Sequence, residues 1–277
     1  MSEKQELSRK ITQLVHRLPL FPSDVDNLLT AAVKPSQDTA EILRLIQSDP
    51  RLSAELLHLA KTHFGMAEDI ETTEDAVHRV GVQPLVQLIG VSYARNAIQE
   101  EFASLKYLSD YFDHSEDIST GCRILGEISD MPQDHREMYA IAGLVHDIGR
   151  LAIMVASNQT NSHVLGTLWD KMASIVREEK ASLGMNHCEV GAQICRKWNF
   201  SAIIQEAVSR HHTPLINSDF SSPGALLFIS HFLSASDLTG EILSAVLPSE
   251  VLANLNLTIA DFDKAQSIYK SRKGSST

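Results

Sequence analysis

Signals that begin and end helices recur along the first third of the chain and restrict its fold more than any other feature. Asp38-Thr-Ala-Glu41 has the form of a capping box and precedes an apolar helical face. Asp49-Pro50 repeats the signal, because aspartate caps helices and proline is tolerated at the first helical position. Thr72 is placed to cap a shorter helix that ends near Gly81. These spacings predict a succession of short, well-delimited helices.

Strand signals, by contrast, are scarce. No Asn-Gly or Asp-Gly turn separates alternating runs, and β-branched residues do not cluster with a period of two. We therefore predict an all-α protein built as a multi-helix bundle. We expect a boundary near residue 100, with one helical subdomain over residues 1–100 and a second over 101–270, followed by a loose tail at 271–277.

Composition narrows the class of protein further. The 277 residues are 43% hydrophobic, which is enough for a core, and the net charge of −11 disfavours non-specific binding to nucleic acid or an anionic membrane. The apolar runs are far shorter than the roughly 20 residues that span a bilayer, and the N-terminus is polar. The three cysteines form no CxxC pair and are expected to be reduced thiols. We expect a cytoplasmic protein.

Two adjacent ionisable residues, His146 and Asp147, interrupt the apolar run from Ala140 to Gly149. An unpaired buried charge costs several kcal/mol, so these side chains need partners. A His-Asp dipeptide is a weak signal by itself. Taken alone, it is better explained by a core histidine with a satisfied hydrogen bond and an aspartate that caps a helix.

Further histidines alter that balance. His114 follows Asp110 by four residues, the spacing at which a carboxylate on the same helical face can join or orient a metal-bound imidazole. His187 and the pair His211-His212 lie downstream, and only the fold can bring them together. The remaining histidines lack partners at useful spacing and are interpreted as surface or packing residues: His16, His58, His63, His78, His135 and His163.

This order of histidines resembles the HD superfamily of metal-dependent phosphohydrolases, and in particular the extended ligand set of HD-GYP phosphodiesterases. A resemblance over nearly the whole chain is to the HDOD family, a helical output module of bacterial signalling. The segments that resemble its N-terminal half are Leu18-Pro-Leu-Phe-Pro22, Gln47-Ser-Asp-Pro-Arg-Leu-Ser53, Leu56-Leu-His-Leu-Ala60 and Glu74-Asp-Ala-Val-His-Arg-Val-Gly81. In these terms, 1–100 corresponds to the N-terminal HDOD subdomain and 101–270 to the HD-like, metal-binding one.

The resemblance implies two sets of metal ligands that share Asp147. One set is His114, His146, Asp147 and His231, and the other is Asp147, His187, His211 and His212. Imidazole-rich sites suit Fe, Zn, Mn or Co better than Mg or Ca, so we expect one or two divalent transition-metal ions. His231 stands where active HD enzymes carry an aspartate, and the Gly-Tyr-Pro signature is replaced by Thr213-Pro-Leu-Ile-Asn217.

Two functions remain open at this point. The first is a regulatory HDOD protein that binds protein partners in a signalling pathway, with a metal centre for structure or sensing. The second is a metal-dependent phosphohydrolase or phosphodiesterase acting on a nucleotide or cyclic nucleotide, in which the ions would activate water and neutralise phosphate charge. In that case Asp147 and Arg150 are the expected catalytic residues, with Arg150 clamping a phosphate-containing small ligand. The whole-length resemblance favours the first.

Overall fold

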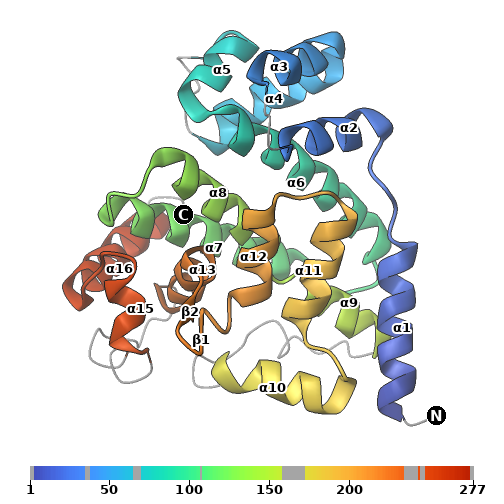
Figure 1. Ribbon diagram of the computed structural model, residues 1–277, viewed down its shortest axis with the longest axis vertical. Coiled ribbons are helices and arrows are strands. Elements are labelled where there is room, and N and C mark those ends of the chain that lie inside the picture. The colour runs from blue at the N-terminus through green and yellow to red at the C-terminus, as the bar shows by residue number, and fades with distance from the viewer. Residues whose placement is uncertain are drawn as a thin grey trace.

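Helices account for nearly all regular structure in the computed structural model, which confirms the predicted all-α fold (Figure 1). The structure describes residues 3–34, 38–64, 70–106, 108–157, 172–233, 243 and 247–274. Its helices are α1 (Glu3–Arg17), α2 (Ser23–Ala32), α3 (Thr39–Ser48), α4 (Pro50–His63), α5 (Thr73–Val80), α6 (Val82–Glu101), α7 (Leu108–Ile128), α8 (Gln133–Gly143), α9 (Ile148–Ala156), α10 (Met172–Leu183), α11 (His187–Lys197), α12 (Ala202–Arg210), α13 (Ser222–Leu233), α15 (Ser249–Ala253) and α16 (Ile259–Gly274).

The predicted helix starts are confirmed by side-chain caps. Asp49 accepts from the Arg51 amide at the start of α4, and Thr72 forms a complete capping box with Asp75 at the start of α5. Asp38 also caps α3, but it accepts from the Ala40 amide. In a capping box the cap would accept from the amide three residues on, here that of Glu41. The Asp38 bond is therefore a simple cap.

Helix α6 links two groups of helices. It packs on α2, α4 and α5, which with α3 form the upper part of the molecule in Figure 1, and it also packs on α8 of the lower part. Helix α1 lies apart from α2–α5 and packs along α9, α10 and α11. The expected boundary near residue 100 falls at the C-terminal end of α6, and the division into two subdomains stays a prediction.

A bundle of six helices forms the part of the core that holds the histidines. Helix α7 packs on α8 and α13, α11 packs on α9 and α12, and α12 packs on α8 and α13. Among the described residues, one stretch, Gln133–Ala156, is long and apolar enough to cross a bilayer, but 94% of its apolar window is buried inside the structure. The segment that interrupts this stretch carries His146 and Asp147.

A two-stranded hairpin and the C-terminal helix depart from expectation. Strands β1 (Leu215–Ile216) and β2 (Asp219–Phe220) pair antiparallel through a turn at Asn217 and Ser218, both with positive φ. Asparagine tolerates that conformation, although an Asn-Ser turn is a weaker signal than the Asn-Gly turns sought in the sequence. Helix α16 continues to Gly274, so residues 271–274 of the expected loose tail are helical, and 275–277 lie outside the described residues.

Candidate metal centre

His146 and Asp147 lie in the tight turn that joins α8 to α9. The backbone turns through bonds between residues three apart, such as the Ile148 amide to the Val145 carbonyl at 3.1 Å. This turn places both side chains inside the bundle, where His146 is 0% and Asp147 is 1% exposed. Asp147 makes no side-chain cap to α9, which the dipeptide alone had suggested, and instead turns toward histidines.

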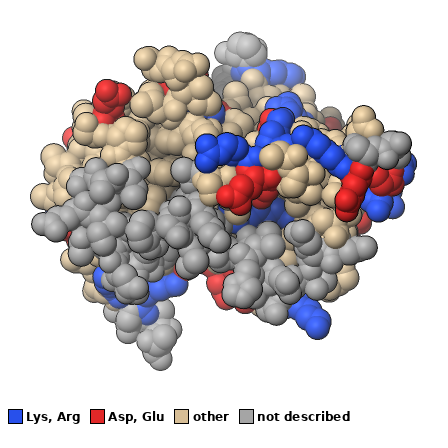
Figure 2. All heavy atoms as spheres, turned by 90° about the horizontal axis from the view of Figure 1, so that it is seen from below, with Lys and Arg blue, Asp and Glu red and all other residues tan. Residues whose placement is uncertain are grey.

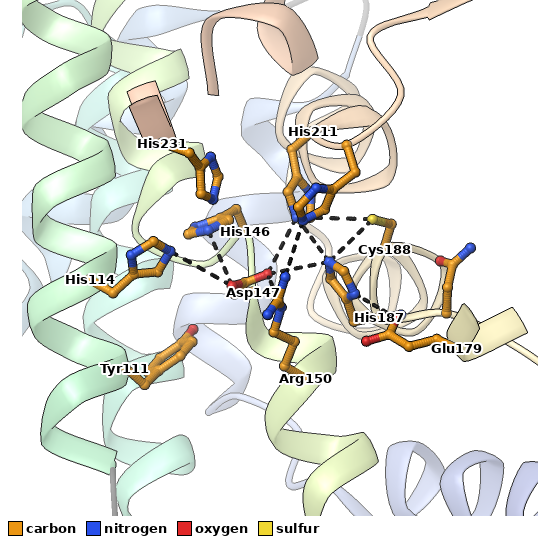
Figure 3. Close-up of polar contacts among 12 residues, drawn as sticks. Tyr111, His114, His146, Asp147, Arg150, Glu179, His187, Cys188, His211 and His231 are labelled. Carbon is orange, nitrogen blue, oxygen red and sulfur yellow. Dashed lines mark hydrogen bonds and ion pairs between the residues drawn. The ribbon is translucent and has the colours of Figure 1, made fainter. Parts of the chain in front are cut away.

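Asp147 is shared by two groups of side chains whose potential ligand atoms lie within 4.8 Å of one another. The first group is His114, His146, Asp147 and His231, and the second group is Asp147, His187, His211 and His212. Figure 3 shows the labelled members pointing toward the Asp147 carboxylate from α7, the α8–α9 turn, α11, the end of α12 and α13. The structure thus brings together all seven side chains that the sequence indicated.

In the first group, His114 and His146 face one oxygen of the shared carboxylate. The Nε2 atoms of His114 and His146 lie 3.8 Å and 3.5 Å from Asp147 Oδ2. The ring of His231 lies 5.0 Å from that of His146 and 5.2 Å from that of His114, measured between centroids. The side chain of His114 is 27% exposed, so this group lies nearer to solvent than the second.

In the second group, His187 and His211 face the other carboxylate oxygen. Their Nε2 atoms lie 3.5 Å and 3.3 Å from Asp147 Oδ1 and only 3.2 Å from each other. The ring centroid of His212 lies 4.4 Å from that of His211 and 4.8 Å from that of His187. All three imidazoles are 3% exposed or less, so this group is enclosed by the bundle.

Hydrogen bonds from Nδ1 set the orientation of four of these rings. The Nδ1 atoms of His146, His211 and His231 lie 2.7 Å from the carbonyl oxygens of Gly143, Val208 and Leu227. His187 Nδ1 lies 2.6 Å from the Glu179 carboxylate. These oxygens accept hydrogen bonds, so each Nδ1 carries the proton and donates. The Nε2 atoms of His146, His187 and His211 then face Asp147, the orientation that metal-binding histidines take.

This donor set fits a metal ion. The lone pairs of His187 and His211 face each other at 3.2 Å, which repels unless a cation or a proton lies between them. His146 Nε2 is buried and has no hydrogen-bond partner among the described residues. Imidazoles with a single carboxylate match the preferences of Zn, Fe, Mn or Co, and the oxygen shells of Mg and Ca are absent from the two groups.

Electrostatics keep Asp147 ionised. Burial opposes its ionisation, but Arg150 and His146 hold the pKa of this carboxyl well below its usual range. Arg150 is 1% exposed, and its Nε donates to Asp147 Oδ1 at 3.0 Å while its guanidinium lies 3.2 Å from His212 Nε2. Arg150 therefore lies against the two groups as a buried countercharge.

The imidazoles divide into two kinds by their pKa values. Burial lowers the pKa of His146, His212 and His231 well below the ordinary value, which keeps these rings neutral and able to bind a metal. For His211, burial acts in the same direction, but Cys188 and Asp147 raise its pKa to about 10. At neutral pH a metal must therefore displace a proton from the second group.

Sequence reasoning missed two residues of this centre and misjudged a third. Glu179, on α10, orients His187 and accepts from both its ring and its backbone amide. Cys188 directly follows His187, and adjacent helical positions ordinarily point in different directions, but the Cys188 Sγ lies 3.5 Å from His187 Nε2. Asp110, expected to support His114, is exposed, and the carboxylate facing His114 is Asp147.

The other histidines that the structure describes do not join the centre. His63, at the end of α4, stacks edge-on against Phe64, and burial lowers its pKa to about 3. His135 stacks on Tyr139 on α8. His16, His58 and His78 belong to neither group, and His163 lies outside the described residues. Their interpretation as surface or packing residues fits this placement.

Comparison with known proteins gives a family match and similar folds. Residues 18–214 match the family described as the HDOD domain. An uncharacterised protein of Treponema pallidum (strain Nichols) is 24% identical over 231 residues. That alignment covers 76% of this chain and 40% of the Treponema protein, so the chain spans about two fifths of the length of this curated relative.

Two solved structures share the fold. A protein of Shewanella amazonensis SB2B, named as a candidate phosphohydrolase, is 21% identical, with a TM-score of 0.65 and 93% of each chain covered. A candidate signal transduction protein of Marinobacter aquaeolei VT8 is 17% identical, with a TM-score of 0.59, 99% of this chain and 65% of that chain covered. At these identities the likeness establishes the fold alone.

Proposed function

Because the chain belongs to the HDOD domain family, we propose that it is a regulatory signalling protein whose two groups of ligands bind transition-metal ions. The proposed ligands are His114, His146, Asp147 and His231 for one ion and Asp147, His187, His211 and His212 for a second. Its partners are proteins of a signalling pathway. The centre joins α7, α11, α12 and α13 to the α8–α9 turn, and metal occupancy is the property that partners sense.

One observation carries the metal assignment: the Nε2 atoms of four imidazoles lie within 4 Å of a single buried carboxylate, Asp147. Burial of these nitrogens around one carboxylate costs free energy unless protons or cations lie between them. The Nδ1 bonds to carbonyls and to Glu179 fix this orientation before any ion arrives. Such preorganisation is typical of metal ligands and has no use in an ordinary packed core.

Burial favours regulation over catalysis. His187, His211, His212 and Asp147 are each 3% exposed or less, so a substrate phosphate finds no free approach to the second group. His231 also replaces the aspartate that the active enzymes use, which removes a negative charge from the first group. Because Arg150 is buried and bonded to Asp147, we assign it a positioning role, in which it holds the carboxylate and its charge in place.

A metal-dependent phosphohydrolase is the second candidate, favoured by the sharing of Asp147 between the two groups. Paired ions in such a site polarise a phosphate and lower the pKa of a bound water. The chain itself offers Asp147 as the common ligand and His114, with its 27% exposed side chain, as the member nearest to an entering nucleotide or cyclic nucleotide.

Elemental analysis tests the metal assignment. We expect one or two Fe, Zn or Mn ions per chain in the protein after purification or loading, and none in Asp147→Asn. Asp110→Asn is the matched control, because it removes the same charge from an exposed position on the helix that carries His114. Wild-type protein that retains no transition metal after loading and dialysis would contradict the assignment.

Hydrolysis assays separate the two candidates. Loaded protein is incubated with a generic phosphodiester and with a cyclic dinucleotide, with Asp147→Asn as the background. The regulatory proposal expects no turnover above that background with any of the metals. Turnover that the wild type and Asp110→Asn share and Asp147→Asn lacks would establish the phosphohydrolase instead.

A further inference from the structure

Tyr111 lies on α7, three residues before His114, and the two side chains therefore share a face of the helix. Tyr111 is 0% exposed, and its hydroxyl has no hydrogen-bond partner among the residues that the structure describes. Ser115, one turn further along α7, donates its hydroxyl proton to the Tyr111 carbonyl oxygen at 2.8 Å. A buried hydroxyl without a partner costs free energy, so this phenol indicates that an acceptor is missing beside it.

The phenol points toward the first group of proposed ligands. Figure 3 shows its hydroxyl directed at the space beside His114 and the Asp147 carboxylate, on the side opposite to His231. Burial and the negative charge of Asp147 raise the pKa of Tyr111. The hydroxyl therefore keeps its proton and is available as a hydrogen-bond donor. The effect of Asp147 on the phenol agrees with the direction in which Figure 3 shows the side chain pointing.

The first group is the one that a ligand from outside can reach. Its member His114 has a side chain that is 27% exposed, whereas the imidazoles of the second group are enclosed. An ion with four protein ligands can expand its shell by one position. A ligand in that position, on the side away from His231, would lie between the ion and the Tyr111 hydroxyl. Because Tyr111 is fully buried, this space suits a molecule of only a few atoms.

We propose that Tyr111 is a positioning residue that donates a hydrogen bond to a small anionic ligand bound by the ion of the first group. The ion takes one electron pair of this anion, and the phenol O–H meets another. A hydrogen bond to a charged acceptor is stronger than one to a neutral acceptor, which favours an anion over a neutral molecule of the same size. This inference rests on the proposed metal centre and adds the class of ligand that a regulatory centre of this kind detects.

Azide titration of the Co(II)-loaded protein tests the inference. Azide is a three-atom anion, and its binding to Co(II) changes the visible bands of the ion. We expect this change in the wild type and in Tyr139→Phe, and at least about 10-fold weaker azide binding in Tyr111→Phe. Tyr139→Phe is the matched control, because it removes a phenol hydroxyl from a 7% exposed tyrosine on α8, whose ring stacks on His135.

Infrared spectroscopy of bound azide gives a readout that altered packing alone would not move. A hydrogen bond to azide shifts its antisymmetric stretch, and exchange of the phenol proton for deuterium alters that shift. We expect the stretch to respond to D₂O in the wild type and not in Tyr111→Phe. The Tyr111 hydroxyl has no partner among the described residues, so its removal should lower neither the Tm nor the Co(II) affinity.

The outcomes distinguish this inference from the proposed function. If no Co(II) binds to the wild type, the metal centre itself is wrong. If Co(II) binds but azide leaves its bands unchanged, or Tyr111→Phe binds azide as tightly as the wild type, the centre stands and the inference is overturned. Equal losses of Co(II) and azide affinity in Tyr111→Phe would give Tyr111 a structural role instead. A tyrosinate-to-iron charge-transfer band in the Fe(III)-loaded wild type, absent from Tyr111→Phe, would make Tyr111 a direct ligand and also overturn the inference.

Discussion

Gly149, two residues after Asp147, lets α9 and α11 approach each other closely enough to form the second group. A Cβ atom at this position would lie 2.0 Å from the His187 carbonyl oxygen and 2.6 Å from the Gly191 amide nitrogen. Real Cβ contacts do not fall below 3.0 Å, so in Gly149→Ala the two helix backbones must separate by about 1.0 Å. His187 moves with α11, and its Nε2, now 3.5 Å from Asp147 Oδ1, leaves bonding range of a shared ion.

The cost follows from two opposing effects. Alanine gains about 1 kcal/mol over glycine inside a helix, whereas overpacking against backbone costs about 3 kcal/mol, the upper end of the usual range. We expect a net loss of about 2 kcal/mol in the free energy of unfolding, or a fall in Tm of about 4–8 °C for a chain of this size. Thermal unfolding of metal-free protein measures this, and elemental analysis measures the loss of the second ion.

Gly126→Ala is the control for this substitution. It lies within α7, where a Cβ would meet the Arg136 side chain at 2.8 Å, and that flexible side chain can move aside. We expect this variant to keep or raise the Tm and to retain its metal. Gly149→Ala with wild-type stability and metal content would refute the argument that backbone contact between α9 and α11 defines the centre.

Three further perturbations follow from the same structure. Burial lowers the pKa of His211, but Cys188 and Asp147 raise it to about 10, so metal binding should release protons and strengthen as pH rises. Calorimetry in buffers of different ionisation enthalpy measures this release. A metal affinity independent of pH would contradict the prediction. Glu179→Gln should weaken metal binding about 10- to 100-fold, because it removes the carboxylate that orients His187. Glu178→Gln, at an exposed position of the same helix, should leave metal affinity unchanged. Equal metal affinities of the two variants would show that Glu179 does not support the centre. Burial lowers the pKa of His63 to about 3 in the folded protein, whereas an unfolded chain binds a proton at this histidine below pH ~6.5. Stability should therefore fall as pH drops through this window, and less steeply in His63→Leu; parallel pH profiles by chemical unfolding would count against it.

The helical architecture could be predicted because its signals are local. A cap such as Asp49 or Thr72 acts within one turn, so a short stretch of sequence contains the whole interaction. The β1–β2 hairpin was missed because its turn carries no comparably strong local signal. Its turn relies on Asn217 and Ser218 adopting positive φ, and its second strand is contacted by Arg210 of α12 through Asp219 at 2.8 Å.

Prediction of the site had a different limit. His146 and Asp147 in an apolar run required partners, and the spacing of the other histidines indicated which residues these were. Glu179 gave no such signal, because an acidic residue on an amphipathic helix is ordinarily solvated, and its partner His187 follows only after α10 ends. Cys188 gave no signal either, because adjacent helical positions ordinarily point in different directions. That rule does not hold at the first turn of α11, where the side chains of both His187 and Cys188 reach the space beyond the helix end.

The positions of the ligands explain why occupancy of the centre can serve as a signal. Each of α7, α11, α12 and α13 contributes an imidazole at or near one of its ends or on its inner face, and Asp147 joins them at the α8–α9 turn. Loss of an ion leaves facing lone pairs at 3.2 Å, which only protonation or separation of the helices relieves. Either response alters the packing between α9, α11 and α12, and α1 packs on α9 and α11. Under the proposed regulatory function, a change at the buried centre is thereby transmitted to α1.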